Sequence, residues 1–361
     1  MKQSQRKRAI TMNYCFNKEN CWNIFKNVFI CVLLLLCFGS SWACTEFQIG
    51  QKNQVFVGRN FDFQTKYATV VINPRGTLNN TRDLLHKGNP LQWVSKYGSV
   101  TVDLADKSGK IYLPAVMSGI NEYGLSASTL WLTKSEFPAH PAKATLPTSL
   151  WPKYFLDNAK TVKEAIQLAK KIDVEPNVYK DRGAVNLHLF VHDARGNAAL
   201  MEYLHGKLVI YHEKDLPILA ITNNPYQESL QYSKQFKGYS CHASFADEAD
   251  SLLRFAKIVY FLKIVPPFES KQQAIAYVFQ GLGYVASPFS KQADSQTVWS
   301  VVFDLADRIL YFRNIDNQQI RIIRLKKFNF SKSQPTKVLS VNNDLSGYVE
   351  NKFSALSDSV N

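Results

Sequence analysis

Cys44 lies at a position where a single residue can supply both a sulfur nucleophile and a base. It follows Ser41-Trp42-Ala43, which has small residues at the positions that precede a signal-peptide cut. A cut after Ala43 would leave Cys44 with its thiol and a free α-amine. The pKa of such an amine is about 7.7–8.0, so the amine can accept the thiol proton near neutral pH without a histidine. The pattern therefore predicts a chain-terminal cysteine nucleophile.

Residues 1–43 have the layout of an export signal. The segment 1–26 is basic, an apolar run follows from Val28 to Phe38, and small residues end it. A membrane span needs about 20 apolar residues, so this run is too short for one. We expect residues 1–43 to be removed and the mature protein to be exported, to the periplasm or out of the cell, with no membrane attachment afterwards. An uncleaved membrane anchor is the alternative.

Two other interpretations of Cys44 remain open, namely an ordinary buried cysteine and a lipidated cysteine. After a lipoprotein-type signal the cysteine would carry a lipid, and the protein would be a surface ligand-binding module without catalysis. Such signals usually have an aliphatic residue where this chain has Ser41, which favours the nucleophile. The chain has six cysteines, of which four lie within residues 1–43. The mature chain therefore has no disulfide framework, and only a bond between Cys44 and Cys241 is open to it.

The segment after Cys44 predicts a β-hairpin. Apolar and polar residues alternate over 44–50 and again over 54–60, on either side of a polar Gln-Lys-Asn turn. If the turn centres on Lys52, antiparallel pairing places Cys44 opposite Asn60. The hairpin would therefore bring the residues around position 60 to the nucleophile.

Arg59 and Asp62 would then lie beside Cys44. A guanidinium at this place favours the thiolate, and a carboxylate accepts hydrogen bonds from the amine and orients it. Residues 59 and 62 face opposite sides of a regular strand, so the arrangement requires a bend near Asn60. Without a chain-terminal cysteine, the same residues would indicate no more than a strand end with a surface ion pair.

Five stretches of the chain together resemble one family of amidases. In chain order they are Cys44-Thr45, Gly58-Arg59-Asn60-Phe61-Asp62, Gly119-Ile120-Asn121-Glu122-Tyr123-Gly124-Leu125, Thr222-Asn223-Asn224-Pro225 and Ser251-Leu252-Leu253-Arg254-Phe255. With these stretches the chain resembles the choloylglycine hydrolase family, the cysteine N-terminal-nucleophile amidases that include penicillin V acylases and conjugated bile salt hydrolases. Trp131 and the export signal resemble the Gram-negative, penicillin-V-acylase-like branch.

The resemblance implies an enzyme that hydrolyses linear amide C–N bonds in small molecules. It also implies the fold of the N-terminal-nucleophile hydrolases, an α+β protein built as a four-layer αββα sandwich. Cys44 matches the nucleophile of the family, with its own amine as the proton shuttle. Arg59 and Asp62 match the pair that supports this nucleophile.

Three further positions match residues of the family's site. Asn223 matches the side chain that donates to the oxyanion, and Trp131 falls where the family has the residue whose backbone N–H is the second donor. Arg254 matches an arginine that helps to hold the nucleophile region. A tetrahedral intermediate develops negative charge and needs fixed donors, so the assignment is chemically consistent. Taken alone, Asn223 could be a turn residue, Arg254 a solvated helix charge and Trp131 part of the core.

The acyl part of the substrate is expected to be apolar or aromatic. Its pocket candidates, chosen for their nearness in sequence to the matched stretches, are Phe63, Tyr67, Trp131 and Trp151. Candidate substrates are phenoxyacetyl-type penicillins, N-acyl homoserine lactones and glycine- or taurine-conjugated bile acids. The formal net charge of +14, part of which leaves with the export signal, suits anionic substrates without choosing among them.

The histidines do not indicate a metal site. They include a His-x-x-x-His pair, His188 and His192, in a segment that indicates a strand. Both side chains would share a face, but no cysteine and no acid except Asp193, which points the other way, completes a ligand set. No phosphate-binding glycine loop, Gly-x-Ser-x-Gly elbow or long basic block is present. We therefore expect no metal, no cofactor and no nucleic-acid partner.

Strand and helix patterns predict antiparallel sheets covered by helices. With 46% hydrophobic and 13% aromatic residues, the composition excludes a disordered or coiled-coil protein. The expected helices are 149–158, 161–171, 247–263 and 270–280, with a capping-box pattern at Thr161 and Glu164. The expected strands are 44–50, 54–60, 99–105, 111–117, 125–132, 184–193, 197–204, 207–212, 217–222, 297–304, 308–314 and 319–325.

We expect a single domain over 44–330 and a loosely held tail, rich in Ser, Asn and Lys, over 331–361. Fewer residues separate Asn223 from Arg254 than in the bile salt hydrolases, where a longer loop contributes to a tetramer. The resemblance therefore leaves open whether this protein forms a homo-oligomer.

Overall fold

The computed structural model describes residues 43–51, 54–179, 183–236, 250–287 and 296–356. All of them belong to one compact unit, which begins at Trp42. Apart from Ala43, the expected export signal lies outside the described residues, and so does Cys241. Cys44 is a free thiol.

One large sheet carries the segment that follows Cys44. It has seven strands in the order β17-β1-β2-β18-β19-β20-β22, and neighbours are antiparallel except β20 and β22. The bounds are β1 Thr45–Gln51, β2 Gln54–Phe63, β17 Ala220–Ile221, β18 Gln296–Asp304, β19 Ile309–Asn314, β20 Arg321–Arg324 and β22 Gly347–Tyr348.

A second large sheet has nine strands in the order β16-β15-β14-β9-β8-β7-β3-β21-β23. All of its neighbours are antiparallel. The bounds are β3 Ala68–Asn73, β7 Ser99–Ala105, β8 Ile111–Asn121, β9 Ser126–Trp131, β14 Leu187–His192, β15 Ala198–Leu204, β16 Lys207–His212, β21 Lys337–Ser340 and β23 Ser354–Ala355.

The remaining elements include α-helices, short 3₁₀-helices and three small sheets. The helices are α2 Trp151–Asn158, α3 Val162–Ala169, α4 Tyr226–Ser233, α5 Ser251–Ile264 and α6 Lys271–Tyr284. Of the helices in the described part of the chain, none is long and apolar enough to cross a membrane. The small sheets contain β4 Leu78–Asn80, β5 Asn89–Pro90, β6 Gln92–Val94, β10 Ala144–Pro147, β11 Ile172–Glu175, β12 Val178–Tyr179 and β13 Gly183–Ala184.

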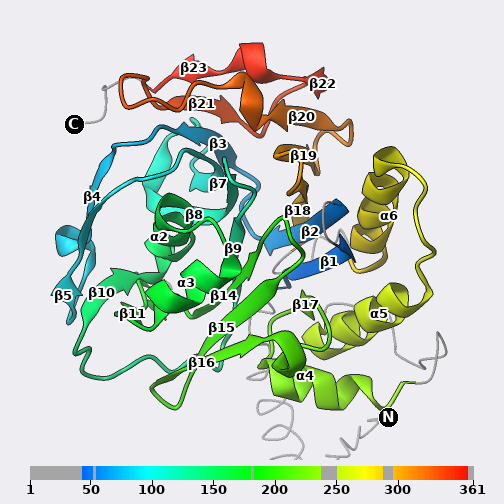
Figure 1. The fold of residues 1–361 in the computed structure, drawn as a ribbon, viewed down its shortest axis with the longest axis horizontal. Helices are drawn as coiled ribbons and strands as arrows, with labels where there is room; N and C mark the ends of the chain where they lie inside the picture. The colour runs from blue at the N-terminus through cyan, green and yellow to red at the C-terminus, as the bar shows by residue number, and fades with distance from the viewer. Residues whose placement is uncertain (1–42, 52–53, 180–182, 237–249, 288–295, 357–361) are drawn as a thin grey trace, which may run out of the picture. The chain divides into compact units, whose positions relative to one another are not determined.

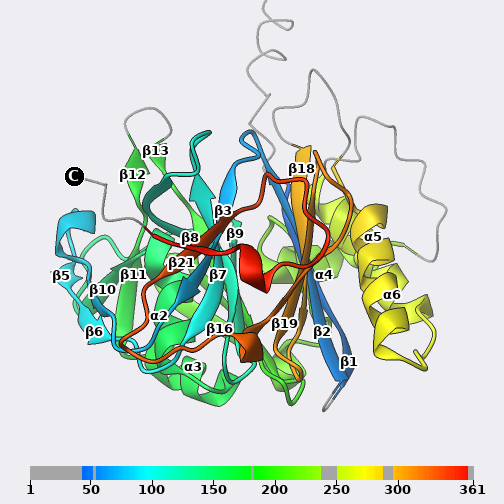
Figure 2. The same cartoon turned by 90° about the horizontal axis from the view of Figure 1, so that it is seen from above.

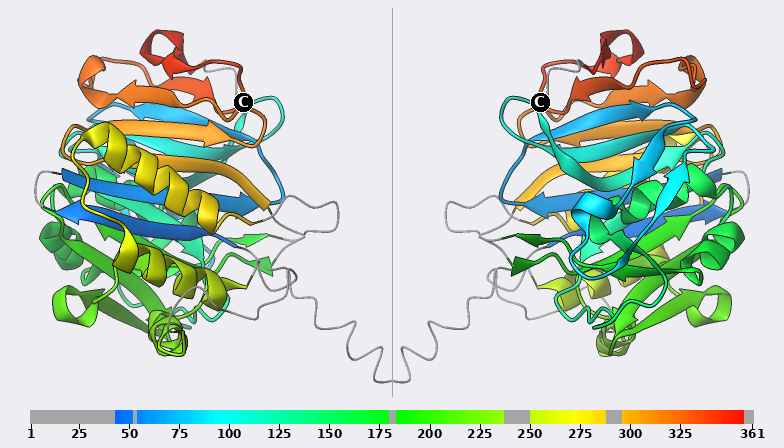
Figure 3. Two further views of the ribbon diagram at one scale, coloured as in Figure 1. Left: turned by 90° about the vertical axis from the view of Figure 1, so that its right-hand side faces the viewer. Right: turned by 90° about the vertical axis from the view of Figure 1, so that its left-hand side faces the viewer.

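The two large sheets lie face to face, and each carries helices on its outer face (Figure 1). α5 and α6 pack on strands β1, β2, β17 and β18, whereas α2 and α3 pack on β8, β9, β14 and β15. Figure 2 shows the layers in succession, and Figure 3 shows α5 and α6 in front of β1 and β2. The expected αββα sandwich of an α+β protein is therefore confirmed.

This layering explains the unusual burial of β2. Helices cover its outer face and the second sheet covers its inner face, so eight consecutive residues of the strand are buried. Gly58 lets α6 approach closely, because a Cβ at this position would lie 2.3 Å from Cγ1 of Val278. A polar residue in β2 is therefore withdrawn from water whichever way it points.

The hairpin of β1 and β2 forms as expected, but its register differs by one residue. The structure pairs Thr45 with Asn60 and Gln51 with Gln54. Only two residues separate the paired ends, so the turn centres between positions 52 and 53 and not on Lys52. The predicted pairing of Cys44 with Asn60 is therefore wrong, and Cys44 lies one step beyond the paired segment.

Most other expected elements are present, with ends that differ by a few residues. The helix caps agree with the sequence: Asp250 and Ser270 accept hydrogen bonds from the first turns of α5 and α6, and Thr161 accepts from Glu164 N–H at 3.2 Å. β3 and α4 were not expected. The strand pattern of β3 is short, and α4 follows directly on Pro225.

The C-terminal segment is not a loose tail as far as the structure describes it. β21 pairs with β3 and β23 pairs with β21 in the nine-stranded sheet, while β22 joins the seven-stranded sheet. Val341 and Val349 are buried in the core. Polar composition concealed these strands, because only a few apolar residues anchor each one. Residues 357–361 lie outside the described part.

Candidate active site

Cys44 lies directly before β1 and is buried, with 4% of its surface exposed. Its thiol points to the backbone carbonyl oxygen of Asp62, 3.9 Å from Sγ. Burial raises the pKa of the thiol, while the nearby Arg59 guanidinium counteracts the shift. A raised pKa keeps the sulfur protonated. The surroundings of Cys44 therefore hold it in the protonated, less reactive form.

Arg59 reaches from β2 to the facing sheet. Its guanidinium is fully buried and donates hydrogen bonds to the backbone carbonyls of Met117 and Thr129, on β8 and β9. Burial lowers the pKa of Arg59, and the neighbouring Cys44 opposes this shift. The arginine nevertheless remains charged, because its ordinary pKa is far above neutral pH. A fixed positive charge thus lies beside the sulfur.

Asp62 is fully buried, and each oxygen of its carboxylate accepts a hydrogen bond from a hydroxyl group. Thr297 Oγ1 donates to Oδ1 at 2.5 Å, and Ser287 Oγ donates to Oδ2 at 2.9 Å. Burial raises the pKa of Asp62 to about 6, although Arg254, the two hydroxyls and Arg59 favour the charged form. Asp62 is therefore mostly ionised at neutral pH in spite of its burial.

Arg59 and Asp62 approach Cys44 from opposite faces of the seven-stranded sheet. Arg59 points to the facing sheet, whereas Asp62 points to the segment that follows α6. The ladder of β2 and β18 is regular through Asn60 and shifts its register between Phe61 and Asp62. The irregularity thus comes one step after the expected bend. Both charges act on the Cys44 thiol, which lies directly before β1 and one step beyond the paired segment of the hairpin.

Arg254 of α5 joins Cys44 to Asn223. Its Nη1 donates to the backbone oxygen of Cys44 and to Oγ1 of Thr45, both at 2.7 Å. Its Nη2 donates to Asn223 Oδ1 at 2.9 Å. Because the guanidinium is a rigid planar fork, these bonds fix the position of Asn223 relative to Cys44. Arg254 is completely buried, so it is a structural tether and not a solvated helix charge.

The amide of Asn223 has a defined orientation. Its Oδ1 accepts from Arg254, and its Nδ2 donates one of two N–H groups to the backbone oxygen of Trp131 at 2.8 Å. Next to Trp131, Leu132 donates its N–H to Asn186 O on the β14 side of β9. Alternation along an antiparallel strand therefore turns the N–H and C=O of Trp131 away from β14, toward Asn223. Both oxyanion donors that the resemblance implies lie on this side of β9.

The turn that carries Asn223 is anchored by a buried histidine. His188 Nε2 lies 2.9 Å from the carbonyl oxygen of Thr222, and its Nδ1 lies 3.0 Å from Glu202 Oε1. A carbonyl oxygen only accepts, so Nε2 carries a proton. The backbone N–H of Asn223 donates to Ser251 Oγ at 2.7 Å. The turn that carries Asn223 is thus held by the nine-stranded sheet on one side and by α5 on the other.

The second member of the histidine pair holds β1. His192 Nδ1 lies 2.8 Å from Gln48 Oε1, and its Nε2 lies 3.1 Å from Glu46 Oε1. The His-x-x-x-His pattern placed both rings on one face of β14 but did not reveal these partners on the other sheet. Among the described residues, no group of three His, Cys, Asp or Glu side chains could hold a metal ion.

The expected pocket residues do not all lie near the nucleophile. Phe63 is half-buried at the end of β2, with its ring centroid 5.3 Å from that of Phe61. Tyr67 precedes β3 and is also half-buried. Trp151 packs in the core between α2 and the nine-stranded sheet, whereas Cys44 belongs to the core between the sheets. Trp151 is therefore near the matched stretches in sequence but belongs to a different core from Cys44.

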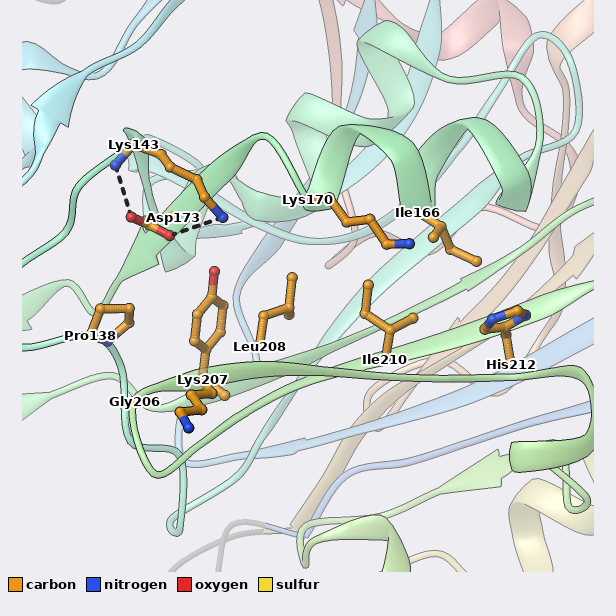
Figure 4. Close-up of a pocket in the computed structure, with 11 residues that line it drawn as sticks. Pro138, Lys143, Ile166, Lys170, Asp173, Gly206, Lys207, Leu208, Ile210 and His212 are labelled. Carbon is orange, nitrogen blue, oxygen red and sulfur yellow. Dashed lines mark hydrogen bonds and ion pairs between the residues drawn. The ribbon is translucent and has the colours of Figure 1, made fainter.

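A cavity of about 540 Å³ opens between α3 and β16 (Figure 4). Ile166 of α3 and Lys170, directly after this helix, lie on one side, and Leu208, Ile210 and His212 of β16 line the other (Figure 4). None of the six expected catalytic residues lines this cavity. It lies on the outer face of the nine-stranded sheet and therefore is not part of the site around Cys44.

The family of this chain follows from comparison with known proteins. The family model described as linear amide C–N hydrolases, choloylglycine hydrolase family, matches residues 44–338. This chain belongs to the choloylglycine hydrolase family. Its activity class is therefore hydrolysis of linear amide C–N bonds, and its substrate is a small molecule. The match begins at Cys44, the residue at which the geometry described above converges.

Members of the choloylglycine hydrolase family resemble this chain over most of its length. Penicillin V acylase from Pectobacterium atrosepticum is 29% identical over 265 residues, which cover 67% of this chain and 69% of that protein. The structure of penicillin V acylase from Agrobacterium tumefaciens gives a TM-score of 0.74 at 27% identity and covers 87% of this chain and 98% of its own. A variant of conjugated bile acid hydrolase from Clostridium perfringens, at 17% identity, gives a TM-score of 0.66 over 88% of this chain and 100% of its own. This last likeness concerns the fold alone.

Proposed function

We propose that this protein is an exported acylase whose nucleophile is Cys44, set free by a cut after Ala43. The observation that carries the proposal is the fork of Arg254, which binds the backbone of Cys44 at 2.7 Å and Asn223 at 2.9 Å. One buried side chain thus holds the nucleophile and an oxyanion donor in a fixed relation. Such preorganisation is costly, since it requires a buried charge, and it is typical of catalytic sites.

The acylation step uses the groups described above. The Cys44 amine takes the thiol proton, and Sγ attacks the amide carbon of the substrate. The second N–H of Asn223 Nδ2 and the backbone N–H of Trp131 donate to the oxyanion that forms. The protonated amine then gives its proton to the leaving nitrogen, the C–N bond breaks, and a thioester to Cys44 remains. Asp62 orients the amine throughout, and Arg59 favours the thiolate.

Deacylation uses the same groups, with water in place of the thiol as the nucleophile. Water attacks the thioester carbon and gives one proton to the Cys44 amine. The same two donors hold the second oxyanion. Collapse of this intermediate breaks the C–S bond, releases the acyl group as a carboxylic acid and returns the proton to the sulfur. No cofactor enters either step, because the chain end supplies both nucleophile and base.

We propose an aromatic or apolar acyl group, of the phenoxyacetyl type, for the substrate. Two relatives, 29% and 27% identical to this chain over the aligned residues, are both penicillin V acylases. Phe63, half-buried one residue after Asp62, and the side chain of Trp131 are the candidates for the pocket wall. N-acyl homoserine lactones and conjugated bile acids are the competing substrate classes.

A hydrolysis panel tests the proposal. Purified mature enzyme is incubated with penicillin V, a long-chain acyl homoserine lactone and glycocholate, and the released acid is quantified by chromatography. We expect turnover of penicillin V, which Cys44→Ala abolishes while the folded state, measured by circular dichroism, is retained. Cys241→Ala, at the other cysteine of the mature chain, is the matched control and keeps activity. Full activity of Cys44→Ala refutes the mechanism.

The non-catalytic lipoprotein is separated from this proposal by the mass of the mature chain. A chain that begins with an unmodified Cys44 fits the acylase, because the amine is then available as a base. A diacylglyceryl adduct or a blocked amine at Cys44 would contradict it. N-terminal sequencing locates the cut in the same sample, and a start at any other residue has the same consequence.

A further inference from the structure

Asp62 is held by two residues that no sequence motif marks. Ser287 lies three positions after the end of α6, and Thr297 belongs to β18. Ser287 N–H donates to Thr297 Oγ1 at 2.9 Å, and Thr297 N–H donates to the carbonyl oxygen of Ser287 at 3.5 Å. Their hydroxyls donate to the two carboxylate oxygens of Asp62. We call this arrangement the Ser287–Thr297 clasp.

The bonds of the clasp set the direction of the Thr297 hydroxyl proton. Because Thr297 Oγ1 accepts the N–H of Ser287, its own proton is left to donate, and the acceptor at 2.5 Å is Asp62 Oδ1. An ionised carboxylate only accepts, so both hydroxyls stabilise its charged form. Hydrogen bonds to a charged group are stronger than those between neutral groups.

The irregularity in the β2–β18 ladder places Thr297 for this role. Thr297 pairs with Asp62 and Trp299 pairs with Phe61, so Val298 is an extra residue in β18. Such a bulge re-aims the side chains next to it. Thr297 is only part-buried, yet its hydroxyl faces a carboxylate that has no exposed surface. The register shift therefore has a local consequence at the candidate site.

The charged groups around Asp62 come from three elements. Arg254 of α5 and Arg59 of β2 favour its ionised form, and the Cys44 thiol before β1 would oppose it once deprotonated. The direct hydrogen-bond partners of its oxygens are the two hydroxyls, whereas both arginines act on the carboxylate through their charge. The hydroxyls are thus the groups that compensate for the lost water most directly.

We infer that Ser287 and Thr297 are positioning residues of the amidase reaction, which keep the Asp62 carboxylate ionised and aimed at the α-amine of Cys44. The inference rests on the proposed function, since it presupposes that the freed amine is the base. It adds two residues whose role is to act through Asp62 without contacting the substrate.

The test is the pH profile of kcat/KM for penicillin V in the mature enzyme. Thr297→Val removes the hydroxyl and keeps the β-branched shape, and we expect it to move the acid limb to higher pH by about one unit. Ser287→Ala is expected to move the limb in the same direction. Thr297→Ser restores the donor and is expected to return the limb to its wild-type position, which a purely structural effect of the valine would not predict.

Thr101→Val is the matched control. Thr101 donates in the same way to Asp103, another buried carboxyl on the far side of the nine-stranded sheet, so its loss leaves the acid limb in place. An acid limb that also stays in place in Ser287→Ala and Thr297→Val overturns the inference. Should Thr297→Val fail to fold, Ser287→Ala decides alone, since it truncates a residue outside both sheets.

Alkylation of Cys44 by iodoacetamide separates this inference from the proposed function. The negative charge of Asp62 disfavours the thiolate, so the alkylation rate shows an inflection where Asp62 titrates, without any need for turnover. If Thr297→Val moves this inflection to higher pH but the wild type hydrolyses no amide, the clasp stands and the proposed function fails. If the wild type is active and neither profile responds, the clasp alone is refuted.

Discussion

Asp62 and Asp103 are two buried aspartates whose carboxyl pKa values are both raised, although the residues lie in different parts of the protein. Burial raises the pKa of each carboxyl to about 6. Asp62 lies at the end of β2 beside Cys44, with two arginines nearby. Asp103 lies on β7, where Val100 and Val102 fill the core between the sheets. Alternation therefore points Asp103 to the other face, under α2, with the nine-stranded sheet between it and Cys44.

The partners of the two carboxyls explain their different roles. Both oxygens of Asp62 receive hydroxyl donors. Asp103 has a hydrogen bond from Thr101, but its Oδ1 has no partner among the described residues, and Lys153 is bound to Asp157 at 2.6 Å. A raised carboxyl pKa thus reports burial in both places. Only the juxtaposition with Cys44 and Asn223, the proposed nucleophile and oxyanion donor, distinguishes the candidate site.

Replacement of each aspartate by asparagine should give the largest difference between the two residues, and this difference is in kcat/KM. Asp62→Asn removes the charge that we propose orients the Cys44 amine. We therefore expect kcat/KM for penicillin V to fall by about 10²–10⁴-fold, the usual range for a group in proton transfer. Asp103→Asn should stay within a factor of two or so of wild type, since it contacts no group of the site. Initial rates at neutral pH check both variants. Comparable losses of kcat/KM in the two variants would show that Asp62 and Asp103 do not differ in their role.

The pH dependence of the free energy of unfolding should show that Asp103, in contrast to Asp62, has a purely structural effect. Its folded-state pKa of about 6 exceeds the unfolded value of about 3.9, so the folded chain holds the proton more tightly. The resulting stability is present below about pH 4 and is lost as the pH rises through about 6. Asparagine carries no charge, so Asp103→Asn should be more stable than wild type at alkaline pH, by up to roughly 3 kcal/mol, and not at acid pH.

Urea unfolding of wild type and Asp103→Asn on both sides of this pH window measures the difference. Asp157→Asn is the contrasting variant, because it leaves the buried ammonium of Lys153 without its partner and should destabilise the protein at alkaline pH. An Asp103→Asn variant whose stability relative to wild type does not change with pH would show that Asp103 is not held neutral by its surroundings.

The smallest expected effect is on the thiol itself. The charge of Asp62 raises the pKa of the Cys44 thiol, so Asp62→Asn should lower it, by about one unit or less, even though the same change reduces turnover. Asp103→Asn should leave the thiol pKa unchanged. The midpoint of the iodoacetamide alkylation profile reports this value in each variant. A midpoint that rises in Asp62→Asn would show that Asp62 does not act on the sulfur through its charge.

The sequence was sufficient for the local parts of this site. The hairpin after Cys44, the helices around Arg254 and most strands follow from short-range periodicity and capping, as Asp250 at the start of α5 illustrates. It was less informative where polar residues form strands, as in β21, and where a short helix follows a proline, as in α4. Trp151 shows the limit of sequence distance, since it lies in the other core.

Sequence alone therefore determined which groups this protein has for chemistry: a cysteine behind a cleavage pattern, an arginine and an aspartate in the paired strand, and matched motifs for a donor and a tether. The tertiary structure decided how they meet. Cys44 lies one step beyond the paired hairpin, Arg254 crosses from α5 to bind it and Asn223, and Ser287 and Thr297 converge on Asp62 from separate elements. The physical reason is that periodicity sets the face of a residue within its own element, whereas hydrogen-bond partners across layers depend on how the two sheets and their helices pack.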